Sequence, residues 1–201
     1  MYVNRIDDME NVLKRIEKKI ISSENIYGAM NYAVWTIILS AYLITESILY
    51  MYVKSSVGGW IYGVFWGMAF AIVIYINAIL WKKSKQLGIV SKNENHAHII
   101  MFLGWLVGGV LWSLISFITS DPWVYVAGFL IFISCGNAGI AFSIRDYRAS
   151  MPIITSLISI PLLPRSAGYI AWTMAVEFVL IGYAISALLY MWAAFTLAGE
   201  N

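Results

Sequence analysis

Long apolar runs, almost free of charge, constrain this chain more than any other feature of its sequence. They cover positions of about 30–53, 58–81, 98–118, 122–144 and 168–194. A run of about 18 or more apolar residues is long enough for a helix to cross the hydrocarbon core of a bilayer. Only 12% of the 201 residues are charged, whereas an ordinary soluble domain carries about 25%. The sequence therefore predicts an all-α, polytopic integral membrane protein.

A sixth, shorter run covers about 150–164 and contains Pro152 and Pro161, with Pro164 at its end. Proline removes a backbone donor and kinks a helix, which a membrane tolerates only where neighbouring groups satisfy the freed carbonyls. This run is compatible with a short crossing, a broken helix or a re-entrant segment. We predict a helical bundle of about six spans, all within one transmembrane domain of residues 29–201.

The Lys and Arg residues fall mainly on one side of the predicted membrane. With six spans, 11 of the 13 lie in segments on the side of the chain termini, and only Lys54 and Arg165 lie on the other side. Because short cytoplasmic loops carry an excess of Lys and Arg, we expect both termini in the cytoplasm and the protein in the cell membrane. The net charge of +2 gives no reason to expect a nucleic-acid partner.

Residues 1–28 precede the first span and form a predicted cytoplasmic amphipathic helix. Their apolar residues are spaced alternately by four and three positions, which places them on one helix face with charged residues around the rest. These residues are Tyr2, Ile6, Met9, Leu13, Ile16 and Ile20. Such a helix can lie along the membrane surface, pair as a short coiled coil with a second copy or a partner, or pack on the loop of residues 82–97.

Small residues recur every four positions in two of the predicted spans. The second span holds Gly59, Gly63 and Gly67, and the third span holds Gly104 and Gly108. Lipid provides little hydrophobic drive between helices, so small residues at this spacing favour association by letting two backbones approach closely. We expect tight packing of the second span on a neighbouring span. The alternative is a face for self-association or for sliding during transport.

Glu46 and Glu177 are the carboxylates that fall inside the predicted spans, and both lie at a similar depth in the outer half of the membrane. An ionisable residue inside a span is a functional candidate by default, and two carboxylates that converge can hold a proton or a cation. The alternative is structural: Glu46 hydrogen-bonds to its neighbours Tyr42 and Tyr50, or either glutamate reaches the interface.

Asn77 and Asn137 are the amides nearer to the inner side. Asn137 lies between Gly136 and Gly139 in the run SCGNAG, which predicts a weak helix that can unwind there. Unwound backbone with an amide is a known means of coordinating a solute or an ion. Hydrogen bonding between helices is the more common use of such residues.

Chemistry of other kinds finds little support in the sequence. His96 and His98 lie near Glu94, but two histidines and one carboxylate in a loop are weak evidence for a metal site, and we expect none. The chain contains no H-E-x-x-H, phosphate-binding glycine loop or G-x-S-x-G. We therefore identify no catalytic residue, name no cofactor and do not favour an enzyme.

Two classes of function remain open at this point. The first is an oligomeric transport or channel protein for an ion or small solute, in which Glu46, Glu177 and Asn137 line a shared interface. The second is a non-catalytic membrane subunit or scaffold, which binds other membrane proteins through its glycine-rich faces and its N-terminal helix. The expected partners are the lipid bilayer and either further copies of the chain or another membrane protein. Convergence of the two glutamates would favour the first class.

Overall fold

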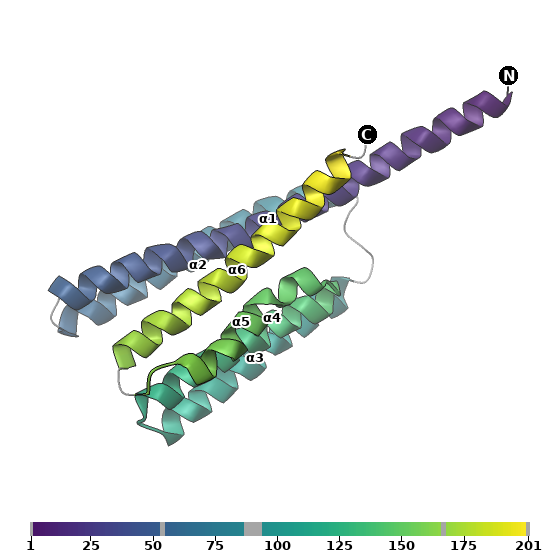
Figure 1. Cartoon of the computed structure of the whole chain (residues 1–201). Coiled ribbons are helices and arrows are strands. Elements are labelled where there is room, and N and C mark those ends of the chain that lie inside the picture. Colours follow the sequence, from purple (N-terminus) through teal and green to yellow (C-terminus); the bar gives the residue numbers. More distant parts are fainter. Residues whose placement is uncertain (1, 53–54, 87–93, 166–167, 200–201) are drawn as a thin grey trace.

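The chain folds as a bundle of long helices, shown in Figure 1. A computed structural model describes the backbone of residues 2–52, 55–86, 94–165 and 168–199, and the side chains of residues 9–51, 60–86, 96–165 and 168–197. The elements in chain order are α1 (Tyr2–Tyr52), α2 (Ser55–Gln86), α3 (Glu94–Ile118), α4 (Pro122–Ile144), the 3₁₀ turn η1 (Tyr147–Ser150), α5 (Met151–Ser159), the 3₁₀ turn η2 (Ile160–Leu162) and α6 (Gly168–Gly199). The described residues contain no strand, which confirms the all-α prediction.

Five of the helices, α1, α2, α3, α4 and α6, are long and apolar enough to cross a membrane. Their exposed surfaces carry large apolar side chains such as Ile37, Ile74, Phe117 and Phe195. A water-soluble bundle would cover such surfaces with polar residues, whereas a helix in lipid is apolar on its outer face as well. The fold is therefore that of an integral membrane protein.

The sixth predicted span corresponds to α5, which is only nine residues long and is extended at both ends by the 3₁₀ turns. The Arg148 carbonyl before α5 accepts a hydrogen bond from Ser186 on α6, and the chain then returns to Gly168, which lies against Pro122 at the start of α4. Ser186 and Gly168 are separated by about 27 Å along α6 at 1.5 Å per residue. The segment thus runs from one end of the bundle to the other rather than turning back.

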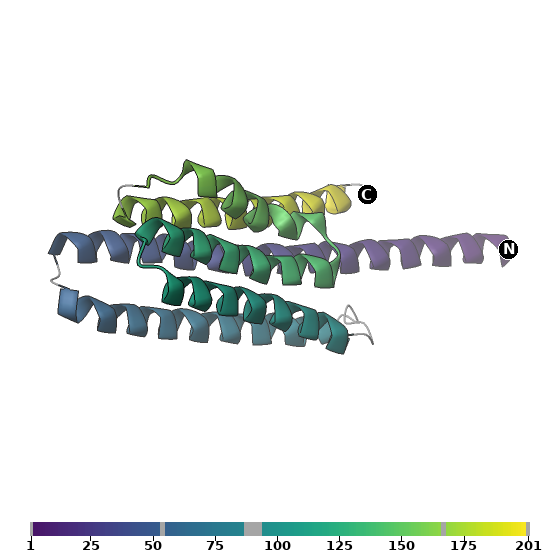
Figure 2. The same ribbon diagram turned by 90° about the horizontal axis from the view of Figure 1, so that it is seen from below.

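The helices are arranged around two close pairs, α3 with α4 and α1 with α6. Helix α5 packs on α6 and α4, and α2 packs mainly on α1 at the edge of the bundle (Figure 2). A core of apolar and aromatic side chains joins α1, α4 and α6. Within it, the ring centre of Tyr32 lies 5.8 Å from that of Tyr183 and 5.7 Å from that of Tyr190. This aromatic cluster holds the first and last helices of the chain together.

Glycine allows α3 and α4 to approach closely. A Cβ atom built on Gly104 would lie 2.7 Å from the carbonyl oxygen of Cys135, and one built on Gly108 would lie 2.8 Å from that of Phe132. On α4, a Cβ atom on Gly136 would overlap the ring of Trp105. Only glycine fits at these contacts, because a side chain there would overlap backbone or a packed ring.

The expectation that the SCGNAG segment unwinds is wrong, because α4 continues as one helix from Pro122 to Ile144. Its glycines serve the contact with α3 instead: Gly136 accommodates Trp105, and a Cβ atom on Gly139 would lie 3.1 Å from Gly104 Cα. The helix tolerates the low helix propensity of glycine because these close contacts require it.

Helix α1 continues without a break from the bundle into a projecting N-terminal arm (Figures 1 and 2). The arm leaves the bundle near Ser22, whose hydroxyl donates a 3.2 Å hydrogen bond to the carbonyl oxygen of Ala194 on α6. The side chains of Met9, Leu13 and Ile16 on the arm are exposed, while those of Tyr2 and Ile6 lie outside the described residues. The amphipathic segment and the first span are therefore one continuous helix.

Candidate functional sites within the bundle

Glu46 is engaged with a side chain on a neighbouring helix. It lies on α1 and is partly buried, and its carboxylate accepts a hydrogen bond from the hydroxyl of Tyr62 on α2. The ring of Tyr62 lies 6.0 Å from that of Tyr42 on α1, and the Tyr42 hydroxyl in turn accepts a 2.7 Å hydrogen bond from the indole N–H of Trp172 on α6. This polar chain connects α2, α1 and α6, and it gives Glu46 a structural partner.

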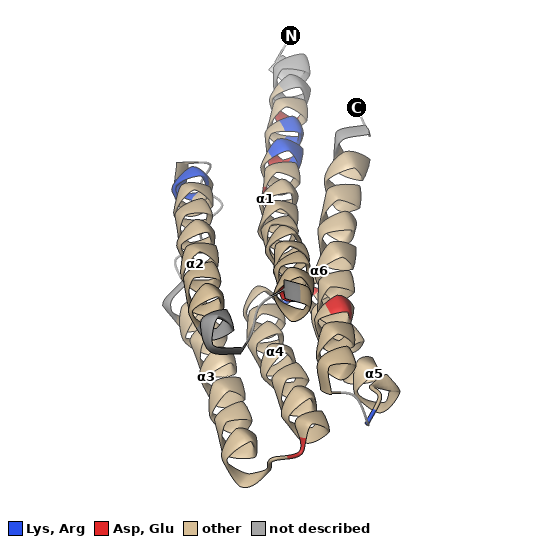
Figure 3. Ribbon diagram, turned by 90° about the vertical axis from the view of Figure 1, so that its left-hand side faces the viewer, with Lys and Arg blue, Asp and Glu red and all other residues tan. Residues whose placement is uncertain are grey.

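Glu177 is exposed on the outer face of α6, a helix that Figure 3 shows mostly in tan with an acidic (red) position part-way along it. At 100° per residue it lies roughly 140° around α6 from Trp172, the residue that contacts Tyr42 beside Glu46. Its neighbours on the same face, Ile170, Ile181 and Leu188, are exposed and apolar. The two glutamates therefore share no partner among the described residues, although they were expected at similar depth.

Asn137 is fully buried, with 0% of its surface exposed. Its side-chain amide donates hydrogen bonds to the hydroxyl of Tyr183 on α6, at 3.0 Å, and to the carbonyl oxygen of Ile133, at 2.9 Å. Its own side-chain oxygen has no hydrogen-bond partner among the described residues. The amide thus acts as a hydrogen-bonding group between α4 and α6, as such residues commonly do in membrane helices.

Gly63 and Gly67 on α2 face away from the other described residues. A Cβ atom built on Gly63 or Gly67 would have nothing within 4 Å, and the side-chain position of Gly59 lies outside the described residues. Asn77, which shares roughly this face by helical geometry, is also exposed. The same small-residue pattern therefore packs within the chain on α3, at Gly104 and Gly108, but faces outward on α2.

A cluster around Arg148 was not identified from the sequence as a site. The Arg148 guanidinium donates to the carboxylate of Asp146, at 2.6 Å from Nη2, and to the side-chain oxygen of Asn25 on α1, at 2.8 Å. Its carbon atom lies 4.3 Å from the centre of the Tyr190 ring on α6, and its carbonyl oxygen accepts from Ser186. This arginine clasp fastens α1, α6 and the turn before α5 at one end of the bundle.

The electrostatics of the clasp favour the charged form of its acid. Burial raises the pKa of Asp146, but the hydrogen bonds from the side chain and backbone N–H of Arg148 outweigh it, so that the pKa of Asp146 lies below its ordinary value of 3.8. The pKa of Arg148 is raised, chiefly by its hydrogen bond to Asp146. The signal in the sequence is only the short spacing of Asp146 and Arg148, since Asn25 is 123 residues away.

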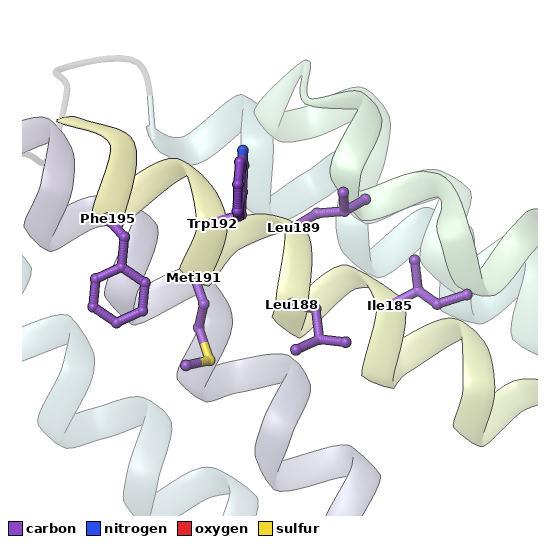
Figure 4. A pocket seen from close by; sticks show the side chains of 6 residues that line it. All are labelled: Ile185, Leu188, Leu189, Met191, Trp192 and Phe195. Atoms are coloured by element: carbon purple, nitrogen blue, oxygen red, sulfur yellow. The ribbon is translucent and has the colours of Figure 1, made fainter. Parts of the chain in front are cut away.

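The surface of the described residues has two apolar hollows, and neither is lined by any of the four polar candidates. One lies on α6 between side chains that include Leu188, Trp192 and Phe195 (Figure 4). The other lies between α1 and α2, where Met30 and Ile37 face Ile76 among other residues. Both hollows are suited to apolar side chains or lipid tails rather than to a polar solute.

The histidines do not gather with other ligands in the described part of the chain. His98 on α3 contacts the ring of Trp81 on α2, with ring centres 5.1 Å apart. No group of three or more His, Cys, Asp or Glu side chains that could hold a metal ion is found among the described residues.

The helices and their apolar outer faces define the class: an integral membrane protein built as an all-α bundle. Comparisons with models of protein families, with curated proteins and with solved structures found no match. The function must therefore be argued from this chain's own residues.

Proposed function

We propose that this chain is a non-catalytic membrane subunit, which assembles side by side with another membrane chain inside the bilayer. The observation that carries the proposal is the outward-facing small-residue face of α2, where a Cβ atom on Gly63 or Gly67 would have no neighbouring atom of the described residues within 4 Å. Small residues at this spacing are a typical contact surface between membrane helices. Their counterparts on α3 show this use within the chain, at the contact with α4.

The polar groups support the same proposal. Inside the bundle, Glu46 and Asn137 each bond to a tyrosine of another helix, as groups that fasten helices do. On the outside, Asn77 and Glu177 are exposed on helices that otherwise present apolar side chains. A polar group that faces lipid is costly, and a neighbouring chain that supplies a hydrogen-bond partner would remove that cost.

The proposal is tested by the size and composition of the complex extracted from the natural membrane in mild detergent, measured by native mass spectrometry. We expect a defined assembly for the natural chain and its loss in the double variant Gly63→Leu/Gly67→Leu. Ile72→Leu is the matched control, because Ile72 is exposed on α2 and lies on the side of the helix opposite the two glycines at 100° per residue. A chain that is monomeric under these conditions, or a double variant that assembles like the control, would refute the proposal.

Transport through an interface between chains is the second candidate, and the exposed carboxylate of Glu177 favours it. Such an interface would enclose this group, which faces away from its own bundle. The test is ion flux in proteoliposomes that contain the intact assembly, with Glu177→Gln compared against Glu46→Gln. Flux that Glu177→Gln abolishes while the assembly stays intact would establish transport over a purely structural role.

A further inference from the structure

We propose that the projecting arm of α1, residues 2–24, pairs with the same arm of a second copy to form a parallel, in-register two-stranded coiled coil outside the membrane. This inference rests on the assembly function proposed above, and it names the partner as a second copy of this chain. It is carried by an uncovered apolar stripe, by the pattern of charges beside that stripe and by the direction in which α1 leaves the bundle.

The arm exposes apolar side chains where the bundle no longer covers them. Met9, Leu13 and Ile16 expose 66%, 61% and 49% of their surfaces. Beyond the arginine clasp at Asn25, helix α1 still contacts α6 at Ser22, and it then projects past the end of α6 (Figure 1). A large apolar stripe in water marks a surface that another chain covers.

The stripe has the spacing of a coiled-coil seam. Written as heptads, Ile6, Leu13 and Ile20 occupy the a positions, and Tyr2, Met9 and Ile16 occupy the d positions. Apolar side chains at these positions provide the knobs for knobs-into-holes packing between helices. The spacing runs through nearly three heptads, a length that also includes the charged positions beside the seam.

The charges beside the seam select a parallel pair. Every charged residue at an e position is acidic, namely Glu10, Glu17 and Glu24, and every charged residue at a g position is basic, namely Arg5 and Lys19. In a parallel, in-register pair each g position faces the e position five residues later on the other helix. Arg5 then faces Glu10 of the second copy, and Lys19 faces Glu24. An antiparallel pair would place g against g and e against e, which sets like charges together.

The continuity of α1 also favours a parallel arrangement of the two arms. Two copies inserted in the membrane with the same orientation project their arms in parallel, because arm and span are one helix. The heptad spacing of the d positions also continues along the exposed face of the span, through Met30, Ile37, Ile44 and Met51. A contact that begins in the arm can therefore continue between the two spans, on the side of α1 where Met30 and Ile37 also line the hollow beside α2.

In the described part of the arm, the ion pair between Glu10 and Lys14 lies beside the seam and does not cover it. Glu10 pairs with Lys14 at 2.7 Å, but both side chains are more than half exposed, and such a surface pair contributes little to stability. Lys14 lies at a b position, outside the seam. Replacing the Glu10–Lys14 pair by an ion pair between Glu10 and Arg5 of the second copy therefore costs little free energy.

The first experiment is disulfide crosslinking in native membranes. In a Cys135→Ala background, which removes the natural cysteine, Leu13→Cys is compared with Asn11→Cys. Cysteines at matching a positions of a parallel, in-register pair are close enough to form a disulfide, whereas those at f positions point apart. We expect a disulfide-linked dimer of this chain with Leu13→Cys and its loss with Asn11→Cys.

The second experiment exchanges the charges. Lys19→Glu places like charges opposite Glu24, so crosslinking at Leu13→Cys should fall, and the double change Lys19→Glu/Glu24→Lys should restore it. Absence of a dimer at Leu13→Cys, equal crosslinking at both cysteines, or failure of the double change to restore it would overturn the coiled coil. A disulfide to a different protein would show that the partner is not a second copy.

The outcomes separate this inference from the proposed function. If Leu13→Cys stays uncrosslinked while the natural chain still forms an assembly that Gly63→Leu/Gly67→Leu disrupts, the coiled coil is refuted and the membrane-subunit function stands. If the arms crosslink but the natural chain shows no assembly sensitive to the glycine face, the contact through α2 is refuted.

Discussion

The hydroxyl of Tyr62 on α2 donates a hydrogen bond to the carboxylate of Glu46 on α1. Helix α2 packs mainly on α1, through Ala69 and Val73 against Ile38 and through aromatic rings that contact Tyr42. The bond between Tyr62 and Glu46 adds a polar contact to this apolar packing.

Replacing Tyr62 by phenylalanine should loosen α2. The carboxylate of Glu46 would lose its donor inside the bundle, at a cost of about 1–3 kcal/mol in the free energy of unfolding. Glu46→Gln keeps an acceptor for Tyr62 and should cost less. Unfolding in detergent, followed by tryptophan fluorescence, measures both variants. Tyr75→Phe is the control, since Tyr75 is exposed on the same helix, and equal effects of Tyr62→Phe and Tyr75→Phe would contradict the prediction.

Leucine at two equivalent positions of the glycine patterns should have opposite consequences. Gly104→Leu should destabilise the single chain by about 1–3 kcal/mol or more, because its Cβ atom would lie 2.7 Å from the backbone oxygen of Cys135. Gly63→Leu should change the unfolding of the single chain by no more than about 0.5 kcal/mol, since its Cβ atom meets nothing within 4 Å. Thermal unfolding of the dissociated chain in detergent measures the difference. A similar loss for both would show that the α2 face is covered within the chain.

The arginine clasp should make stability depend on acid pH. The pKa of Asp146 is lower in the folded chain than its ordinary value of 3.8. For an acid whose pKa falls on folding, the stabilising contribution is complete above the unfolded pKa and is lost as pH falls through the folded pKa. We therefore expect the contribution of Asp146 to be constant from neutral pH to about pH 5 and to decline below pH 4.

Asp146→Asn removes this titration and serves to test it. We expect the variant to be less stable at neutral pH by about 1–3 kcal/mol, because Arg148 loses its charged acceptor, and to approach the natural chain in stability under acid conditions. Unfolding curves of both chains between pH 3 and pH 7 measure the difference. A gap that stays constant over this range would show that Asp146 titrates with an unshifted pKa or not at all.

Glu177→Leu should separate the stability of the single chain from that of the assembly. The change places an apolar side chain among Ile170, Ile181 and Leu188, which share the exposed face of α6. The unfolding of the dissociated chain should therefore be unchanged within about 0.5 kcal/mol or improved. If a partner bonds to the carboxylate, the assembly should be weaker, as native mass spectrometry would measure, with Glu177→Gln between the two. Full assembly in both variants would exclude a role for Glu177 in binding a partner.

Composition and periodicity predict much of this fold, because a helix in lipid must satisfy its backbone internally and present an apolar surface. The predicted span of 122–144 has the same bounds as α4, which begins with a proline after the N-cap Asp121. The other ends are harder to predict where polar residues continue a helix beyond the apolar run. Helix α2 extends to Gln86, five residues past the end that its apolar run indicates.

The functional residues are less predictable, because depth along a span is visible in the sequence and the partner of each face is not. Glu46 and Glu177 were expected at similar depth, yet one bonds to Tyr62 and the other faces outward. The glycines of α2 and α3 have the same spacing and opposite surroundings. The contact of Arg148 with Asn25 joins residues 123 positions apart, which no local pattern predicts.

The uninterrupted course of α1 from Tyr2 to Tyr52 has a mechanical consequence. A helix of 51 residues is about 76 Å long at 1.5 Å per residue. It contains no proline, so none of its backbone hydrogen bonds is lost to a proline kink. A rotation applied to the arm outside the bundle turns the membrane part as well, including the side chain of Glu46 that holds α2. A partner that binds the arm can therefore act on the far end of the bundle through α1.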